Sequence, residues 1–449
     1  MLPRFEIVAR RRPVALVSPD ATVVDRDLAG ADDPASYPTP APAPYVAVTA
    51  VPAGGRVRLD LASGDVRLSG WYDAGSGRVG LEEVRGGRTS RHASRRHGRT
   101  TGPVTQVGLT LTGTHLTLLC REAGHWTARG RVDLAGRVDT RDEAWLAGLR
   151  SGHRGAVRRV RAGGFGQLGL RDPRLVTTTD GTPVREGGAL LLTASSAGPG
   201  FFDTAHTSVW SLDPEGWRLR HRADLFFRRP DRPGVYGDHA THLVRDGDAW
   251  LVATSTWGDF DLRRGRGTVD VTLARSRADL LSGRHVLDTE PLALPTTGFG
   301  SVGVWDPHLV RTAEGWLVGY VSARRFFEFH PVLAQGPRLD RLTLRAAATD
   351  RLATEGTTLL RLDDGWRVLA SDGRDGGPGQ RRRFPVFDLD LAEVGELDAP
   401  YPTNIPWPTL ARDEEGWVMV SFNGAEYGGE LTGYGTHGTL VLMRSGVSR

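Results

Sequence analysis

The chain has 449 residues, 39% of them hydrophobic and 24% charged, which is typical of a soluble globular protein with room for two or more domains. All 57 residues counted as lysine or arginine are arginine. The absence of lysine excludes enzymes that depend on a Schiff-base lysine, a pyridoxal lysine or a phosphate-loop lysine. Acids alternate with the arginines along most of the chain and the formal net charge is +4, so the sequence does not indicate a nucleic-acid partner.

Three local features bear on partners and compartment. The basic cluster at residues 85–99 is interpreted as a solvated loop, with a polyanion-binding patch as the alternative. Cys120 is the only cysteine, and its place in the run LTLLC predicts a buried apolar role. The N-terminus lacks the apolar core of a signal peptide, and no run of 18 apolar residues follows it. We therefore expect a cytoplasmic protein with no membrane partner.

Short strands dominate the first third of the chain. Residues 1–44 end in the proline-rich run ADDPASYPTPAPAP, which predicts an N-terminal arm and an extended linker. Over residues 45–157, apolar and polar residues alternate in short runs between glycine-rich turns, which favours an antiparallel β-sandwich. The succession VGLTLTGTHLTLLCREAGHWTARGRV resembles a jelly roll of the concanavalin or laminin-G type, a kind of domain often attached to glycosidases.

A repeat occupies residues 158–449. A polar turn followed by a strand recurs as REGGALLLTAS, DGDAWLVATS, AEGWLVGYVS, DDGWRVLAS and DEEGWVMVS. The equivalent positions in these five copies, 50 to 66 residues apart, are Leu190, Trp250, Trp316, Trp366 and Trp417. One antiparallel sheet per copy, with no helix between copies, predicts radial repetition. The predicted fold is all-β, a β-sandwich (jelly roll) followed by a five-bladed β-propeller.

The strand before each repeated turn is expected to lie nearest the propeller axis, with its leading residue facing a shared cavity. These leading residues are Asp172, His239, Asp306, Glu355 and Trp407, and three of the five are carboxylic acids. A proline after each aspartate is expected to hold the aspartate in an extended backbone. Carboxyl groups this close drive their pKa values apart, so that one stays protonated while another is ionised. Paired carboxyl groups of this kind perform glycoside cleavage.

At these acids the repeat region resembles glycoside hydrolase family 43 and its five-bladed relatives. The resemblance implies that Asp172 is the general base, that Asp306 tunes the pKa of the acid, and that Glu355 is the general acid. It also implies a fifth-blade histidine near the axis, His437 in YGTHGTLVLM, beside a bound water or a structural Ca²⁺. No cofactor is expected to be required. Where the family usually has proline after the Glu-Gly of the acid motif, this chain has Thr357.

Aromatic and histidine side chains complete the predicted site. Trp305 and Trp407 lie at the acid end of their strands, where they either stack on sugar faces or pack between blades. His239, His308 and His437 are expected to bind substrate hydroxyls, with a structural role as the alternative for the first two. The histidines show no compact ligand spacing, so no metal site is predicted.

The predicted activity is cleavage of a glycosidic bond in an oligo- or polysaccharide, with an arabinofuranosidase-like preference for furanosides that rests on the family alone. Glu355 would protonate the glycosidic oxygen while Asp172 deprotonates an attacking water, which inverts the anomeric carbon. Three alternatives stay open. The first is a retaining fructosidase-like enzyme with Asp172 as the nucleophile, and the second is a glycoside phosphorylase that uses Arg324 and Arg325. The third is a propeller that binds carbohydrate without catalysis.

Overall fold

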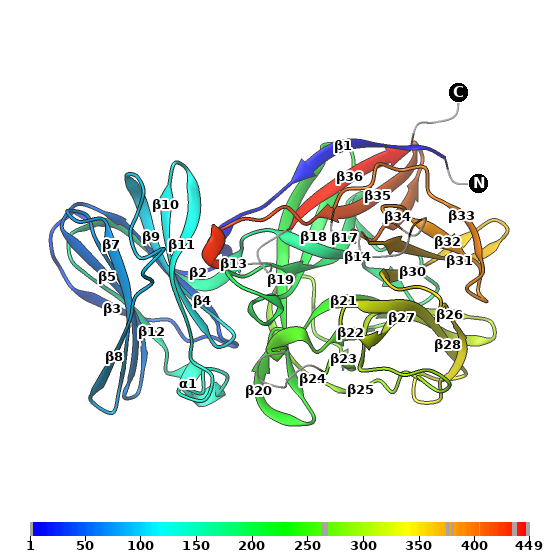
Figure 1. The fold of residues 1–449 in the computed structure, drawn as a ribbon, viewed down its shortest axis with the longest axis horizontal. Helices are drawn as coiled ribbons and strands as arrows, with labels where there is room; N and C mark the ends of the chain where they lie inside the picture. Colours follow the sequence, from blue (N-terminus) through cyan, green and yellow to red (C-terminus); the bar gives the residue numbers. More distant parts are fainter. Residues whose placement is uncertain are drawn as a thin grey trace.

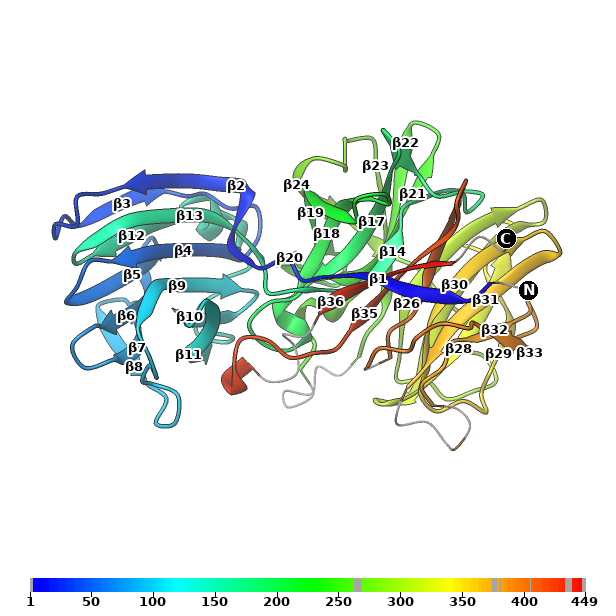
Figure 2. The ribbon, with the colours of Figure 1, turned by 90° about the horizontal axis from the view of Figure 1, so that it is seen from above.

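The protein is described by a computed structural model over residues 3–261, 268–373, 378, 381–403, 405–432 and 438–445. A β-sandwich and a five-bladed β-propeller lie side by side, as the two views in Figure 1 and Figure 2 show. Within the described ranges the single α-helix is α1 (Glu143–Ala147), capped by Asp142, whose carboxylate accepts a hydrogen bond from the backbone N–H of Trp145. No helix in these ranges is long and apolar enough to cross a membrane.

The sandwich consists of two six-stranded antiparallel sheets around one apolar core. The first sheet contains, in spatial order, β11 (His125–Asp133), β10 (His115–Glu122), β9 (Val104–Thr112), β4 (Tyr45–Pro52), β13 (Val157–Gln167) and β2 (Ala15–Asp27). The second sheet contains β3 (Ala35–Pro38), β12 (Arg150–Arg154), β5 (Arg56–Ser63), β6 (Val66–Asp73), β7 (Arg78–Arg85) and β8 (Arg88–His92). The strands predicted from period-two alternation are confirmed because every second side chain faces the core.

Two smaller predictions concern this domain. Cys120 is buried in β10, and burial raises the pKa of its thiol to about 12, which confirms the predicted apolar role. The basic cluster is not entirely a loop, because residues 88–92 form the edge strand β8. The side chains of β8 are mostly exposed, and exposed charge on an edge strand discourages pairing with another chain.

Five further sheets form the blades of the propeller in the described part of the chain. The first contains β14 (Leu170–Leu175), β17 (Ala189–Ser196), β18 (His206–Asp213), β19 (Arg218–Arg229) and β20 (Arg232–Tyr236), with β16 (Arg185–Glu186) on β17 and β24 (Gly283–Asp288) on β19. The second contains β15 (Thr177–Thr178), β21 (His239–Asp246), β22 (Ala249–Ser255), β23 (Val271–Ser276) and β25 (Glu290–Pro291).

The last three blades are simpler four-stranded sheets. The third contains β26 (Gly303–Thr312), β27 (Gly315–Arg325), β28 (Glu328–Gly336) and β29 (Thr343–Ala347). The fourth contains β30 (Thr354–Leu362), β31 (Gly365–Asp372), β32 (Pro385–Phe387) and β33 (Glu393–Glu396). The fifth contains β34 (Thr409–Asp413), β35 (Gly416–Asn423), β36 (Thr439–Ser445) and β1 (Phe5–Arg11).

The repeat read from the sequence coincides with the blades. The five repeated positions are each the second residue of β17, β22, β27, β31 and β35, namely Leu190, Trp250, Trp316, Trp366 and Trp417. The first three of these side chains are buried and the last two are half-buried. All five pack into the apolar clusters of the propeller, so the predicted repeat is confirmed.

The prediction that residues 1–44 form an arm and a linker is wrong. β1 pairs antiparallel with β36 and is the outer strand of the fifth blade, where the blue and red ribbons lie side by side in Figure 1. β2 and β3 are edge strands of the two sandwich sheets. Edge strands tolerate charged residues and proline, and β2 contains Pro19. These segments therefore lack the alternation of apolar and polar residues that marks an inner strand. The boundary at residue 158 also moves, because β13 belongs to the sandwich and the blades begin at Leu170.

The two domains share an apolar contact. Tyr45, Trp126 and Phe165 of the sandwich pack with Phe226 and Val235 of the first blade in one buried cluster. Because this cluster removes several aromatic side chains from water, it fixes the sandwich against the propeller.

Candidate active site

A β-bulge recurs near the start of the inner strand in four blades. The pairing register with the second strand shifts between Arg171 and Arg174, His239 and His242, Trp305 and His308, and Glu355 and Thr358. One residue in each bulge has a positive φ, namely Asp172 (54°), Ala240 (57°), Asp306 (57°) and Gly356 (79°). The expected extended backbone at the two aspartates is therefore wrong, because the bulge holds both in the left-handed region.

The bulges also show that the three acids are not in equivalent positions. Asp172 and Asp306 are the left-handed residues of their bulges, whereas Glu355 comes one residue earlier, before Gly356. Glu355 therefore corresponds to Trp305 of the third blade and to Arg171 of the first. Asp172 and Asp306 therefore enter the pocket from one position along the inner strand, and Glu355 enters it from the position one residue earlier.

All three predicted acids line one pocket at the end of the inner strands. The lining residues are Arg171, Asp172, Phe202, His239, Ala240, Trp257, Phe260, Trp305, Asp306, Phe326, Phe327, Phe329, Glu355, Ile405, Trp407 and Phe422. Four blades contribute their inner strands, and the fifth contributes Phe422 of β35 and the segment before β34. A concave pocket with a few convergent polar groups in an apolar wall is the usual form of a small-molecule site.

Glu355 is placed to hold a proton at neutral pH. Burial in the pocket wall, and then the negative charge of Asp172, raise the pKa of Glu355 to about 8. The indole of Trp305, with Nε1 3.4 Å from Oε2, and the charge of Arg171 act in the opposite direction. Because Trp305 donates to Oε2, the other carboxyl oxygen is left to carry the acidic proton.

Asp172 has partners that favour its ionised form. Burial raises the pKa of Asp172, but the charge of Arg171 and a hydrogen bond from Ser195 oppose the rise. The Nε of Arg171 lies 3.3 Å from Oδ2 of Asp172. Among the three acids, Asp172 is thus the one with a directly adjacent cation, as a base or nucleophile requires.

Asp306 lies deepest in the pocket. It is 2% exposed, and its Oδ2 has no hydrogen-bond partner among the described residues. Burial, and then the charges of Glu355 and Asp172, raise the pKa of Asp306 well above its ordinary value, against the effect of Arg174. Asp306 therefore keeps its proton at a higher pH than an ordinary aspartate does.

Arg174 was missed in the sequence, yet it joins three blades beneath the acids. Its guanidinium donates to the backbone carbonyls of Asp306 (2.9 Å) and Thr357 (3.3 Å) and to the hydroxyl of Thr358 (3.1 Å). Burial lowers the pKa of Arg174 to about 10, while Asp306 and Asp172 raise it, so the side chain stays cationic at neutral pH. Arg174 could have been found from its position directly after the bulge, because polar residues occupy the same position in other blades, namely His242, His308 and Thr358.

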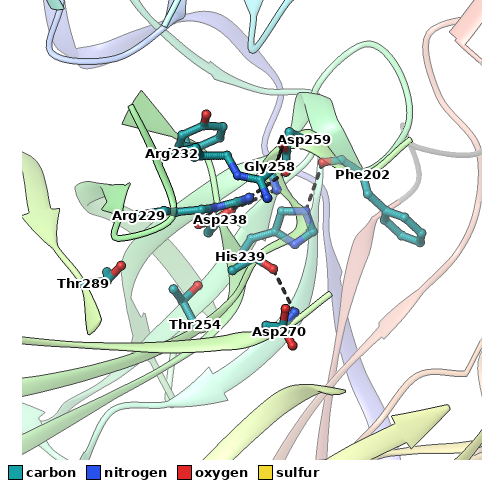
Figure 3. A network of polar contacts seen from close by, with 12 residues as sticks. Phe202, Arg229, Arg232, Asp238, His239, Thr254, Gly258, Asp259, Asp270 and Thr289 are labelled. Carbon is teal, nitrogen blue, oxygen red and sulfur yellow. Dashed lines mark hydrogen bonds and ion pairs between the residues drawn. The ribbon is translucent and has the colours of Figure 1, made fainter. Parts of the chain in front are cut away.

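His239 lines the pocket, but both of its ring nitrogens are engaged with protein. The Nδ1 atom lies 3.2 Å from the hydroxyl of Ser195, and Nε2 donates to the carbonyl of Phe202 at 3.1 Å (Figure 3). Burial, and then the charge of Arg171, lower the pKa of His239 well below its ordinary value. A neutral imidazole with these partners holds the wall in place and offers the substrate mainly its ring face.

His308 does not line the pocket. Its Nδ1 accepts the backbone N–H of Leu359 at 3.4 Å, and its ring stacks on His242 with centroids 4.1 Å apart. Burial lowers the pKa of both histidines well below the ordinary value, so each is a neutral link between neighbouring inner strands. His308 therefore has the contacts of a structural histidine, which was the alternative to binding substrate. His437, with its expected water or Ca²⁺, lies outside the described residues.

Trp305 and Trp407 form part of the pocket wall and also pack between blades. Trp407 is 2% exposed, and its Nε1 donates to the carbonyl of Pro173 at 3.1 Å. A Cβ added at Gly356 would lie 2.1 Å from the Cβ of Trp407. Only glycine fits there, so the residue next to Glu355 is constrained both by a φ of 79° and by this close approach.

Two 3₁₀ turns supply further aromatic residues to the wall. Phe202 belongs to η1 (Phe202–Thr204) and Trp257 to η2 (Trp257–Asp259), and their rings are 4.7 Å apart. The carboxylate of Asp259, at the end of η2, accepts hydrogen bonds from Arg229 (Nη1 to Oδ1, 2.7 Å) and Arg232 (Nη1 to Oδ2, 2.7 Å), as Figure 3 shows. This buried ion network fixes η2 against the first blade.

The sandwich holds the same two turns from the other side. The Nη2 atom of Arg141 donates to the carbonyl of Gly258 in η2 at 2.8 Å. The hydroxyl of Tyr45 donates to the carbonyl of Ala205, directly after η1, at 2.8 Å. The N-terminal domain therefore contacts the backbone that carries the pocket wall.

The remaining expectations concern a metal and phosphate. In the part of the chain that the structure describes, no group of three or more histidine, cysteine or acidic side chains is arranged to hold a metal ion. Arg324 and Arg325 are exposed and do not line the pocket. Arg325 pairs with Glu328 on the same hairpin. The two arginines proposed for a phosphorylase thus lie outside the site.

Comparison with known proteins yields no family. No protein-family model and no curated protein matches the chain. A GH32 β-fructofuranosidase of Bombyx mori is 15% identical, with 62% of this chain and 60% of that chain covered and a TM-score of 0.43. A family 117 glycoside hydrolase of Zobellia galactanivorans is 10% identical, with 62% of this chain and 84% of that chain covered and a TM-score of 0.45. A levansucrase of Bacillus subtilis is 11% identical, with 62% of this chain and 86% of that chain covered and a TM-score of 0.44. The chain spans only 60% of the silkworm enzyme, and likeness at this level assigns no activity.

Proposed function

We propose that the protein is a glycoside hydrolase with Glu355 as general acid and Asp172 as general base. The observation that carries the proposal is the convergence of three carboxyl groups, from the inner strands of three blades, on one pocket with an aromatic wall. Their surroundings differ in the way this chemistry needs. The pKa of Glu355 is raised to about 8, while Asp172 lies beside the cation Arg171.

In the proposed mechanism, Glu355 transfers its proton to the glycosidic oxygen as the bond to the anomeric carbon breaks. Asp172 takes a proton from a water that attacks the opposite face of the sugar, so the configuration is inverted. Asp306 keeps its expected role of tuning the pKa of the acid, because the charges of Asp306 and Glu355 act on one another. Arg174 contributes indirectly, because it holds the backbone of Asp306 and keeps a positive charge beneath the acids.

Membership in family 43 and an arabinofuranosidase-like preference for furanosides are part of the proposal and rest on the resemblance at the acids. A retaining fructosidase-like reaction, in which Asp172 attacks the anomeric carbon, uses the same residues and is the alternative. The anomer first released, followed by NMR, separates the two, because inversion and retention give opposite configurations. Exposed Arg324 and Arg325 do not support a phosphorylase.

Hydrolysis of a panel of nitrophenyl furanosides and pyranosides by the wild type identifies the sugar. The methyl glycoside of that sugar, whose leaving group needs a proton, then tests the proposal in the wild type and in Glu355→Gln. We expect the variant to lose turnover by about 10²-fold or more while its affinity for the substrate, measured by calorimetry, changes little. Equal hydrolysis by both proteins would remove the acid assignment. Binding without hydrolysis by the wild type would instead favour a carbohydrate-binding propeller.

A further inference from the structure

We infer that the leaving-group side of the pocket is a binding subsite for an apolar aglycone, so that the substrates are glycosides of aryl or aryl-alkyl alcohols rather than chains of sugars. The inference rests on the proposed function, because it needs Glu355 as the acid that protonates the leaving group. It narrows the substrate class of that same site.

The aromatic wall begins at the catalytic acid. The indole of Trp305 donates to Glu355, and its ring is parallel to that of Phe326, with centroids 6.2 Å apart and an interplanar angle of 5°. Phe326 contacts Phe260 at 4.8 Å, and Phe260 contacts Trp257 at 4.9 Å. A general acid lies next to the oxygen of the leaving group. The wall that continues from Glu355 therefore faces the aglycone.

Among the described residues, the pocket lining has few polar side chains beyond its acids. In the described part of the lining, the other polar side chains that are not aromatic indoles are Arg171 and His239. Arg171 lies against Asp172, and His239 is bonded to Ser195 and to the Phe202 carbonyl. A second sugar would bring several hydroxyls into this wall, and each hydroxyl that loses water without a new partner weakens binding. An aromatic or alkyl group avoids that cost.

Phe327 is the second observation that points to a ligand. It follows Phe326 in the turn between β27 and β28, lines the pocket, and is 60% exposed. Its φ is 72°, in the region that glycine or asparagine adopts with least strain. A phenylalanine in this place strains the backbone and buries little of its ring. Folding does not account for it, whereas an apolar group bound against the ring does.

The test keeps the sugar that the hydrolysis panel identifies and varies only the aglycone. Methyl and 2-phenylethyl glycosides have leaving alcohols of similar basicity, so a difference in kcat/KM between them reports contacts of the aglycone. We expect kcat/KM for the 2-phenylethyl glycoside to exceed that for the methyl glycoside, and for a disaccharide of the same sugar, by about tenfold or more.

The variant Phe327→Asn removes the ring and suits the left-handed backbone, so its melting temperature is expected to equal or exceed that of the wild type. The preference for the 2-phenylethyl glycoside should fall at least about threefold. The matched control is Val394→Asn, at a side chain 55% exposed on β33 of the fourth blade, which should keep the full preference.

Two results overturn the inference alone, while hydrolysis itself persists. The first is a wild-type enzyme that cleaves the methyl glycoside or the disaccharide as well as the 2-phenylethyl glycoside. The second is an unchanged preference in folded Phe327→Asn. Absence of hydrolysis of every glycoside overturns the proposed function and this inference with it, so the two failures are distinguishable.

Discussion

Glu355 gives the proposed reaction its dependence on pH. Burial and the charge of Asp172 raise the pKa of Glu355 to about 8, so the carboxyl group is protonated below that pH and ionised above it. The protonated form is the active acid, and kcat/KM is therefore expected to fall as the pH rises through about 8. Ionisation of Asp172, whose pKa is also raised by burial, should limit the rate at the acidic end. A pH profile that begins to fall at the ordinary pKa of a glutamate would contradict the assignment.

At the residue scale, the sequence revealed the acids but not their surroundings. Asp172, Asp306 and Glu355 were found because acids recur before a repeated turn, and they do line one pocket. Arg171 and Arg174 were missed because arginine is the only strongly basic residue type in this chain and is scattered along it. The one-residue offset of Glu355 is visible in the sequence, because Glu355 precedes its buried leucine by four residues whereas each aspartate precedes its leucine by three. The β-bulge that gives this spacing its structural meaning was missed.

At the scale of elements, the two 3₁₀ turns that carry Phe202 and Trp257 are held by polar contacts from neighbouring elements as well as by their packed rings. Arg141 reaches from the sandwich to the carbonyl of Gly258, and its guanidinium carbon lies 4.8 Å from the ring centre of Tyr236. We infer that Arg141 positions the pocket wall, although it does not line the pocket.

The substitution Arg141→Met tests this positioning role. It keeps much of the side-chain volume but removes the hydrogen bond to η2, so KM should rise about tenfold while kcat changes less. The matched control is Arg150→Met, at an exposed sandwich arginine that donates to Ser36. A loss of thermal stability without a change in KM would contradict the positioning role.

Elements were predictable to different degrees. The inner sandwich strands and the second strand of each blade were found because burial on one face enforces period-two alternation. The sequence of β1, β2 and β3 was interpreted as an arm and a linker. These are edge strands, which accept proline and arginine, so their apolar and polar residues alternate less regularly than those of inner strands. The hairpin tip at Phe326 and Phe327 gave no signal, since a turn of two phenylalanines lacks the usual glycine or asparagine.

At the scale of the molecule, the N-terminal strand completes the propeller. β1 pairs with β36 from Phe5 to Arg11, so the first and the last described strands share one blade. The Phe5 side chain is 0% exposed in the apolar cluster between the fourth and fifth blades. Loss of β1 would therefore expose part of that core.

Phe5→Ala measures the contribution of this closure. Removing the buried ring should lower the free energy of unfolding by about 3–5 kcal/mol, as for other buried aromatic residues. Val8, on the same strand but 44% exposed, supplies the control, and Val8→Ala should change stability by less than about 0.5 kcal/mol. Denaturant unfolding of both variants gives the comparison, and equal stabilities would show that β1 is not needed for closure.

The central claim is that Glu355 protonates the leaving group, and the dependence of Glu355→Ala on the leaving group tests it most directly. A 2,4-dinitrophenolate leaves without a proton, whereas an alkoxide does not. We predict that the variant keeps kcat/KM for the dinitrophenyl glycoside within about tenfold of the wild type but loses about 10³-fold for the methyl glycoside. An equal loss for both substrates, or no loss for the methyl glycoside, would contradict the account.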